Sequence, residues 1–282
     1  MMSNIPIGIV RDMPAEQYHA DPSVSNSMLT TLSKSPAHFY ALYLDESRPA
    51  RESTAAMQAG TLAHTAILEP MQLARRYVTK PDGMSFATKE GKAWRDQQTL
   101  EIVQADAIDA ALAQQAAVLS VPQLRQILSK GEAEVSLFWD DESTGLRCRA
   151  RCDWLHWTGQ NRVIAMDLKT TADITPEGVR RSIASYGYHR QHAHYCNGLR
   201  ACGIEVEAFV FGFVSNSYPF LAAPYLLDDE AMEQGQQEID ELLNLYAWCK
   251  ERNEWPFVDG YQIASLPNWA KRINEVEVGY AD

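Results

Sequence analysis

The stretch LRCRARCDWLHWTGQNRVIAMDLKTT, residues 146–171, decides the fold that this sequence predicts. Its two halves alternate apolar with polar residues and are rich in β-branched and aromatic types, which is typical of β-strands. The segment TGQN at 158–161 separates the halves and has the composition of a turn. Together with EAEVSLFW at 132–139, the stretch predicts a three-stranded antiparallel meander.

Helices are expected on the N-terminal side of this meander. Serines that can cap a helix, and prolines that can begin or end one, mark their limits. Pro70 ends one helix and Pro122 interrupts another, because proline does not continue a helix. The expected elements are two short helices within 25–44, a helix at 54–68, an irregular or weakly extended segment at 71–88 and a helical region at 89–130.

Residues after the meander predict a second set of elements. A helical region begins at Thr175-Pro176 and runs to about Cys202, with a break at Gly187. We expect the aromatic residues Phe39, Tyr40 and Tyr43 of the N-terminal helices to pack inward. The remaining expected elements are strands at 205–215 and 219–227, a long amphipathic helix at 228–252 and a tail.

The composition is that of an ordinary globular protein. Of 282 residues 46% are hydrophobic, and no stretch approaches the roughly 20 apolar residues of a membrane-spanning helix. Five cysteines without a C-x-x-C pair predict reduced thiols, so we expect a soluble, cytoplasmic protein without contact to a membrane. The net charge of −12 argues against a uniformly basic DNA-coating surface, but arginines concentrated within 147–200 allow a local basic channel.

Asp153, Asp167 and Lys169 are the residues of the meander that carry chemistry. If the turn is centred in TGQN, Asp153 lies opposite Met166 or Asp167, and Asp167 shares a face with Lys169. Two adjacent carboxylates are costly unless a cation lies between them, and oxygen ligands suit Mg²⁺ or Mn²⁺ better than zinc. A lysine beside such a metal suits phosphodiester hydrolysis. The alternative is a structural Asp–Lys ion pair on an exposed strand.

Three arginines lie on the same strand as Asp153, at every second position before it. Arg147, Arg149 and Arg151 lie on the face that carries Asp153 and could follow a phosphate backbone towards it. Equally, they could form a solvated strand face that pairs with acidic residues elsewhere in the chain.

The helical segment YGYHRQHAHY at 186–195 carries a further polar group. Gln191 and Tyr195 are four residues apart and project together, so they can hold phosphate oxygens or a lysine. His192 and His194 do not face each other on a helix, which is poor spacing for a zinc site. Arg190 is a candidate DNA contact.

These residues resemble the PD-(D/E)XK nuclease superfamily, and more narrowly the C-terminal nuclease domain of exonuclease VIII (RecE-like). The opening segment YHADPSVSNSMLTTLSKSPAHFY, the histidine motif GTLAHTAILEP, CDWL with MDLKTT, and QHAHY follow one another in the family's order. The resemblance spans about 16–270. It implies an α/β (α+β) fold with a mixed central sheet flanked by helices. We expect one domain over 1–282, with a mainly helical part at 1–130, a catalytic sheet core at 131–227, and a C-terminal helix and tail at 228–282.

The resemblance implies a role for each residue of the core motif. Asp153 and Asp167 would bind the catalytic Mg²⁺, for which Mn²⁺ could substitute, assisted by the main-chain carbonyl of Leu168. Lys169 would serve the attacking water. His64 would be an additional metal ligand, a role that the residues alone do not indicate, because a lone helical histidine is more often structural.

Other motif positions receive supporting roles. Gln191 and Tyr195 would support the scissile phosphate and the catalytic lysine. Lambda-exonuclease-like relatives use an upstream acidic residue for a second metal. Glu134 is the candidate, and Glu132 on the same face could serve instead. The first motif reads Cys152-Asp153 rather than Pro-Asp, and the second acid is Asp rather than Glu, but neither change removes a ligand.

Two further groups stay open between a structural and a functional role. Ser25 and Ser27 either cap the first helix or hold a terminal DNA phosphate at its N-terminus. Lys89, Lys92 and Arg95 either contact DNA or form a solvated helix face.

The resemblance implies a 5'-to-3' exodeoxyribonuclease, of phage or prophage type, that acts on linear double-stranded DNA. It would leave 3' overhangs for a single-strand annealing protein in homologous recombination, and would assemble as a homo-oligomeric ring, a tetramer before a trimer. Alternatives are a RecB-like or Cas4-like nuclease within a larger complex and a non-catalytic DNA-binding protein that kept the fold.

Overall fold

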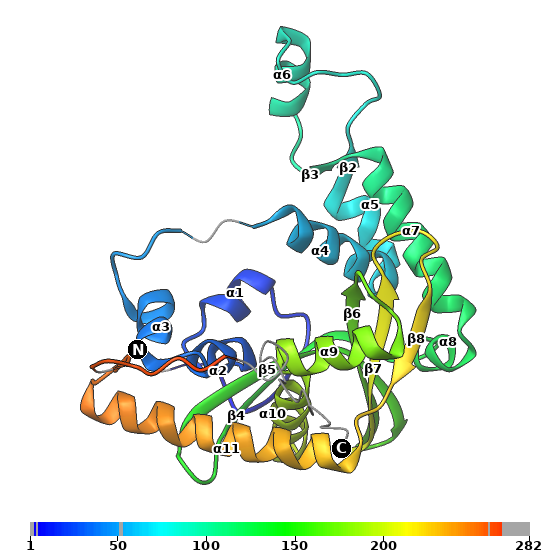
Figure 1. Ribbon diagram of the computed structural model, residues 1–282. Helices are drawn as coiled ribbons and strands as arrows, with labels where there is room; N and C mark the ends of the chain where they lie inside the picture. The colour runs from blue at the N-terminus through cyan, green and yellow to red at the C-terminus, as the bar shows by residue number, and fades with distance from the viewer. Residues whose placement is uncertain (1–2, 4, 51–52, 259, 267–282) are drawn as a thin grey trace, which may run out of the picture.

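A six-stranded mixed sheet runs through the protein in the order β1–β4–β5–β6–β7–β8 (Figure 1). The computed structural model describes residues 3, 5–50, 53–258 and 260–266. Strands β6 and β7 run parallel, and every other neighbouring pair in this sheet is antiparallel. The strands are β1 (Gly8–Val10), β4 (Glu132–Asp140), β5 (Arg147–Gly159), β6 (Arg162–Thr171), β7 (Glu205–Ser215) and β8 (Ala222–Tyr225).

The expected meander forms with the expected register. In the β5–β6 hairpin Trp154 lies opposite Met166 and Leu155 opposite Ala165, so the numbers of these paired residues sum to 320. This register sets Asp153 and Asp167 across from each other at the middle of the sheet. The hairpin prediction is therefore confirmed.

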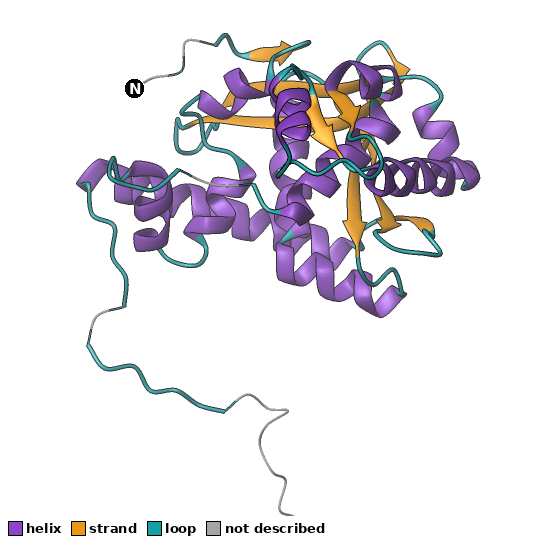
Figure 2. Ribbon diagram, turned by 90° about the horizontal axis from the view of Figure 1, so that it is seen from above, coloured by secondary structure: helices purple, strands orange, loops and turns teal. Residues whose placement is uncertain are grey.

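Helices cover both faces of the sheet (Figure 2). On one face the core joins α2, α3, α9, α10 and α11 to the inward side chains of β4, β5 and β7, whereas on the other it joins α4, α7 and α8 to β6 and β7. The helices of the first face are α2 (Asn26–Leu32), α3 (Pro36–Phe39), α9 (Pro176–Tyr186), α10 (Tyr188–Ala201) and α11 (Asp229–Arg252). Those of the second face are α4 (Ala55–Leu68), α7 (Ala105–Ser120) and α8 (Pro122–Leu128).

Capping residues fix the helices that carry the site. Thr54 accepts a hydrogen bond from the Met57 N–H and begins α4. Gly187 has φ +68°, a left-handed conformation that favours glycine, and it separates α9 from α10 as the sequence predicts. Helices α4 and α10 are thereby set on opposite sides of β6.

Several elements differ from the sequence prediction. Strand β1 was not expected, and Tyr40 is 42% exposed at the start of a short π-helix, η1 (Tyr40–Leu44), instead of packing inward. The segment predicted as irregular and then helical contains a two-stranded parallel sheet that carries a projecting helix α6 (Figure 1). The remaining elements are α1 (Ala15–Ala20), a 3-10 turn η2 (Pro70–Gln72), α5 (Leu73–Arg76), β2 (Tyr77–Thr79), α6 (Lys89–Asp96) and β3 (Glu101–Val103).

The chain continues beyond α11 without regular secondary structure to Leu266, the last residue described. Trp255 anchors the beginning of this tail by stacking on Phe39, with ring centroids 5.1 Å apart. The expected tail beyond residue 266 lies outside the described residues. None of the helices within the described ranges is long and apolar enough to cross a membrane.

Candidate active site

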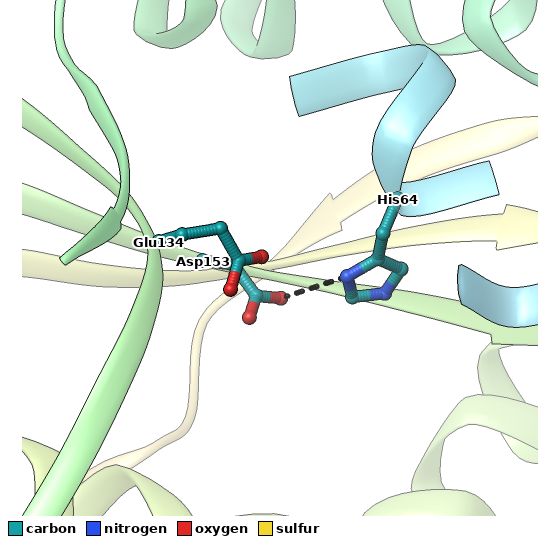
Figure 3. A group of neighbouring side chains, drawn as sticks. All are labelled: His64, Glu134 and Asp153. Carbon is teal, nitrogen blue, oxygen red and sulfur yellow. Dashed lines mark ion pairs between the residues drawn. The ribbon is translucent and has the colours of Figure 1, made fainter. Parts of the chain in front are cut away.

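His64, Glu134 and Asp153 bring one potential ligand atom each to the same point, and these atoms lie within 4.8 Å of one another. The three residues come from α4, β4 and β5, and their side chains point toward one another (Figure 3). His64 Nδ1 is 3.6 Å from Asp153 Oδ2. Residues 89 positions apart in sequence thus meet at one potential metal site.

The backbone of β4 is distorted where it supplies Glu134. Glu134 has φ +55°, while its neighbours Ala133 and Val135 remain paired with β5 opposite Trp154 and Cys152. A left-handed conformation is rare for a residue other than glycine and is often found at functional sites. Here the distortion falls at the position that faces Asp153.

Glu132, the alternative acidic residue, has a different partner. It forms an ion pair with Arg11, whose Nε lies 2.6 Å from a Glu132 carboxylate oxygen. Of the two acidic residues that the sequence left open, Glu134 lies in the cluster of potential ligands.

Asp167 lies beside this cluster and is held by one cationic donor and one neutral polar donor. Its Oδ1 is 2.5 Å from Lys169 Nζ, and its Oδ2 accepts a hydrogen bond of 2.5 Å from Gln191 Nε2 on α10. The Leu168 N–H between them donates to Asp153 Oδ2 at 2.8 Å. This backbone bond links the two aspartates through β6.

Tyr188 is a contact of Lys169 that sequence reasoning missed. Lys169 Nζ lies 4.5 Å from the centroid of the Tyr188 ring, at the start of α10. The signal that could have found it is helical spacing, since Tyr188 precedes Gln191 by three residues and shares its face.

Burial and mutual repulsion raise the pKa of two of the carboxyl groups. Burial, followed by the nearby Asp153, raises the pKa of Glu134 to about 7 and the pKa of Asp167 to about 7. Burial opposes the charge on Lys169, but Asp167 and Asp153 outweigh it and raise the pKa of that ammonium. The site thus combines a protonated lysine with carboxyl groups whose negative charge the nearby cations do not fully compensate.

A divalent cation fits this donor set. Asp167 Oδ1 is buried with the Lys169 ammonium as its polar neighbour, and Glu134 and Asp153 offer carboxylate oxygens beside the imidazole of His64. Oxygen-rich ligands with one nitrogen suit Mg²⁺ or Mn²⁺, whose positive charge would favour the ionised carboxylates. Glu134, Asp153 and His64 are the residues that could hold it.

The rest of helix α10 is mostly structural. The Tyr195 ring packs edge-to-face on Phe209 with centroids 6.2 Å apart, and burial raises the pKa of its phenol. His194 Nε2 lies 2.9 Å from the Arg149 carbonyl oxygen, and burial lowers the pKa of His192 and of His194 to about 4. Both histidines are therefore neutral near pH 7, and neither belongs to the cluster of His64, Glu134 and Asp153.

The structure contradicts the prediction that Arg149 and Arg151 follow a DNA backbone. Arg149 is 5% exposed, and its guanidinium donates to the carbonyl oxygens of Tyr18 and Asp21. Arg151 donates to the Met13 carbonyl and, like Arg147, is turned to the N-terminal segment, which covers this face. Buried guanidinium groups bonded to carbonyl oxygens cannot follow a phosphate backbone.

Arg190 is also unavailable as a DNA contact. Its side chain is 14% exposed and lies 2.6 Å from a carboxylate oxygen of Glu238 on α11. The same carboxylate lies 3.1 Å from His189 Nε2. Arg190 therefore joins α10 to α11.

The two groups that the sequence left open take different positions. Ser25 is buried and accepts a hydrogen bond from the Met28 N–H as the cap of α2, and its hydroxyl lies 3.0 Å from that of the exposed Ser27. Lys89, Lys92 and Arg95 are exposed on the projecting helix α6.

The fold and the cluster of acidic residues around a strand lysine define a PD-(D/E)XK nuclease domain. The chain belongs to the family described as "PDDEXK-like domain of unknown function (DUF3799)", which matches residues 25–261. The predicted superfamily and fold class are therefore confirmed, whereas the RecE-like subgroup stays a prediction.

One solved structure agrees with the fold. A protein from Eubacterium rectale described as "Putative exonuclease" superposes with a TM-score of 0.61 at 15% sequence identity, over 87% of this chain and 88% of that chain. At this identity the likeness supports the fold alone. A second structure, SSO0001, has a TM-score of 0.28 at 14% identity, over 50% of this chain and 67% of that chain, and carries no argument. No curated protein matches the chain.

Proposed function

We propose that this protein is a Mg²⁺-dependent exodeoxyribonuclease that digests linear double-stranded DNA from the 5' end and leaves 3' overhangs. The observation that carries the proposal is the meeting of His64, Glu134 and Asp153 beside the Asp167–Lys169 pair. Acidic ligands, a buried lysine and an amide from the next helix are the groups that phosphodiester hydrolysis requires.

In this proposal Glu134, Asp153 and His64 hold the metal, with Asp167 and the Leu168 carbonyl as further ligands. When bound, Mg²⁺ would supply Lewis-acid stabilisation of the phosphate and a more acidic water.

Lys169 then acts on the phosphate and the attacking water, and Gln191 acts through Asp167. The raised pKa of Lys169 keeps its Nζ protonated, so it acts as a donor that orients the water and balances charge on the phosphate oxygens. Gln191 Nε2 fixes the Asp167 carboxylate through the 2.5 Å hydrogen bond and thereby positions Lys169. Tyr195 has a supporting role from the same helix.

The motif order along the chain supports the biological setting. It resembles exonuclease VIII, so we propose action in homologous recombination of phage or prophage type, beside a single-strand annealing protein. We further propose that the protein forms a homo-oligomeric ring in the host cytoplasm, with a tetramer as the preferred ring size and a trimer as the second choice.

Strand-specific digestion tests the activity. Linear duplexes labelled at the 5' or the 3' end are incubated with purified protein and Mg²⁺, and we expect early release of the 5' label and persistence of the 3' label. Equal loss of both labels would contradict the polarity, whereas binding without any release would favour a non-catalytic DNA-binding protein. Light scattering of the same sample measures the assembly, and a monomer that digests DNA only with other proteins would favour a RecB-like or Cas4-like subunit.

A further inference from the structure

A cavity of about 530 Å³ lies between α4, α7 and α9, next to the candidate active site. It opens where β6 and β7 end, and its walls include Thr170, Thr171 and Asn216. The crevice beyond the carboxyl ends of parallel strands is a common place for ligands in sheets with helices on both faces. A volume of this size is in the range of nucleotide-sized and other small ligands, about 300–1,000 Å³.

Tyr188 joins the cavity to the catalytic lysine. Its ring lines the cavity and is 4.5 Å from Lys169 Nζ. Thr170 and Thr171, which directly follow Lys169 on β6, line the same space. A group in this cavity would therefore lie beside the residue that acts on the scissile phosphate.

Tyr186 provides an aromatic surface at the same wall. Its ring stacks on Tyr188 with centroids 5.6 Å apart and an interplanar angle of 27°, yet the residue is 63% exposed. Nucleic-acid bases stack on exposed aromatic rings regardless of sequence. Tyr186 is therefore placed to receive a base.

The other walls suit the rest of a nucleotide. Helix α9 contributes hydrogen-bond donors to the lining, from Ser182, Ser185 and Arg181. The exposed Arg181 forms an ion pair with Asp173, the acidic residue of the lining, with 3.0 Å between the guanidinium nitrogen and the carboxylate oxygen. Apart from Gln114, the residues that α4 and α7 contribute to the opposite wall are small, among them Ala59 and Gly60, and they leave the space open.

We propose that this cavity binds one unpaired nucleotide of the DNA strand that is cut, with its base stacked on Tyr186. The inference rests on the proposed nuclease function and adds the form of the substrate at the site. A base within a duplex cannot enter a cavity of this kind without leaving its stack. The duplex end must therefore be opened by at least one base pair before the strand reaches Lys169.

Fluorescence of 2-aminopurine tests the stacking directly. The base analogue is placed at the first, second or third nucleotide of the cut strand, and binding is measured with Lys169→Ala protein so that the DNA stays intact. We expect quenching at the nucleotide that occupies the cavity. Adding Tyr186→Ala should abolish that quenching and weaken binding of a duplex with a single-stranded end about tenfold, whereas Tyr186→Phe should preserve both.

Two further variants separate stacking from damage to the fold. Ala59→Phe places a large side chain in the cavity from the opposite wall and leaves residue Tyr186 unchanged. It should also abolish the quenching. Tyr261→Ala removes a fully exposed tyrosine outside the lining and should change nothing. If Tyr186→Ala behaves like Tyr261→Ala in quenching and affinity, the proposal is overturned.

Digestion of linear duplex by the wild type separates this proposal from the proposed function. Nucleotide release by the wild type without quenching would overturn the cavity proposal and leave the nuclease standing. Quenching without nucleotide release would support a single-strand site and overturn the nuclease. If neither quenching nor nucleotide release is observed, both the cavity proposal and the proposed nuclease function are overturned.

Discussion

Lys169 Nζ lies 2.5 Å from Asp167 Oδ1, and both side chains are largely buried on the same strand. Each residue compensates the other, because Lys169 lowers the pKa that burial raises in Asp167 and Asp167 keeps Lys169 protonated. The pair therefore acts as a unit, and removing one member leaves the other without its main partner.

Lys169→Ala is expected to lower DNA digestion by at least about 10³-fold while DNA affinity changes little, because it removes a positive charge needed for the transition state. Release of labelled nucleotide measures turnover and a mobility-shift titration measures binding. Lys169→Arg keeps the charge but not the geometry, so it should restore little activity. Digestion by Lys169→Ala at the wild-type rate would remove Lys169 from the catalytic group.

Glu134 and Glu132 provide a matched pair for the metal site. Glu134→Gln should weaken Mn²⁺ binding by at least about tenfold, because it replaces the carboxylate of one of three converging ligand groups by a neutral amide. Glu132→Gln should leave binding unchanged, since that carboxylate pairs with Arg11. Titration calorimetry of both variants gives the comparison. Equal affinity in Glu134→Gln and the wild type would place the metal elsewhere.

The pH dependence of stability follows from the raised carboxyl pKa values. In the folded, metal-free protein Asp167 and Glu134 have pKa values of about 7, above those of an unfolded chain. Their contribution to stability is therefore present at low pH and is lost as pH rises through about 7. These carboxyl groups lose their contribution between their unfolded pKa, about 4, and about 7, so we expect the metal-free melting temperature to fall as the pH rises towards about 7 and to level off above it, and Mg²⁺ to counteract this fall.

Asp167→Asn is the control for this prediction. It cannot ionise, so its melting temperature should depend less on pH than that of the wild type. The fall should be clearest above about pH 6.5, because the half-buried His192 and the buried His194 act in the opposite direction and reduce stability when the pH falls below their unfolded pKa. An unchanged slope in Asp167→Asn would contradict the assignment of the raised pKa to this residue.

Local signals explain what the sequence predicts well. The Thr54 cap, the left-handed Gly187 and the β5–β6 turn act within a few residues of their effects, so the helices and the hairpin register follow from them. The hairpin register also brings Asp153 and Asp167 together. This part of the candidate site is therefore accessible from residue pattern alone.

Long-range packing explains what the sequence does not predict. Strand β1 has three residues, too few for a periodic pattern, and it forms because Ile9 pairs with the distant Leu137. His64 reaches Asp153 from a helix 89 residues earlier, so only its resemblance to a known motif indicated a role. Alternation placed Arg149 and Arg151 on one face, but it could not tell whether solvent or the N-terminal segment covers that face.

Replacing Arg149 tests whether the N-terminal segment covers this face of β5. Arg149→Met should destabilise the protein by about 3 kcal/mol, because it leaves two buried carbonyl oxygens, those of Tyr18 and Asp21, without their donor. Arg180→Met, at an exposed residue of α9, should change the free energy of unfolding by less than about 0.5 kcal/mol. Urea denaturation measures both variants.

DNA binding by the folded Arg149→Met protein completes the comparison. A buried guanidinium releases no counterion from DNA, so both the affinity and its dependence on salt should match those of the wild type. If the salt dependence instead fell by the equivalent of about one phosphate contact, Arg149 would reach the DNA backbone and the stripe would be a binding surface after all. Stability and salt dependence therefore separate a guanidinium that fastens the N-terminal segment to β5 from one that guides the substrate.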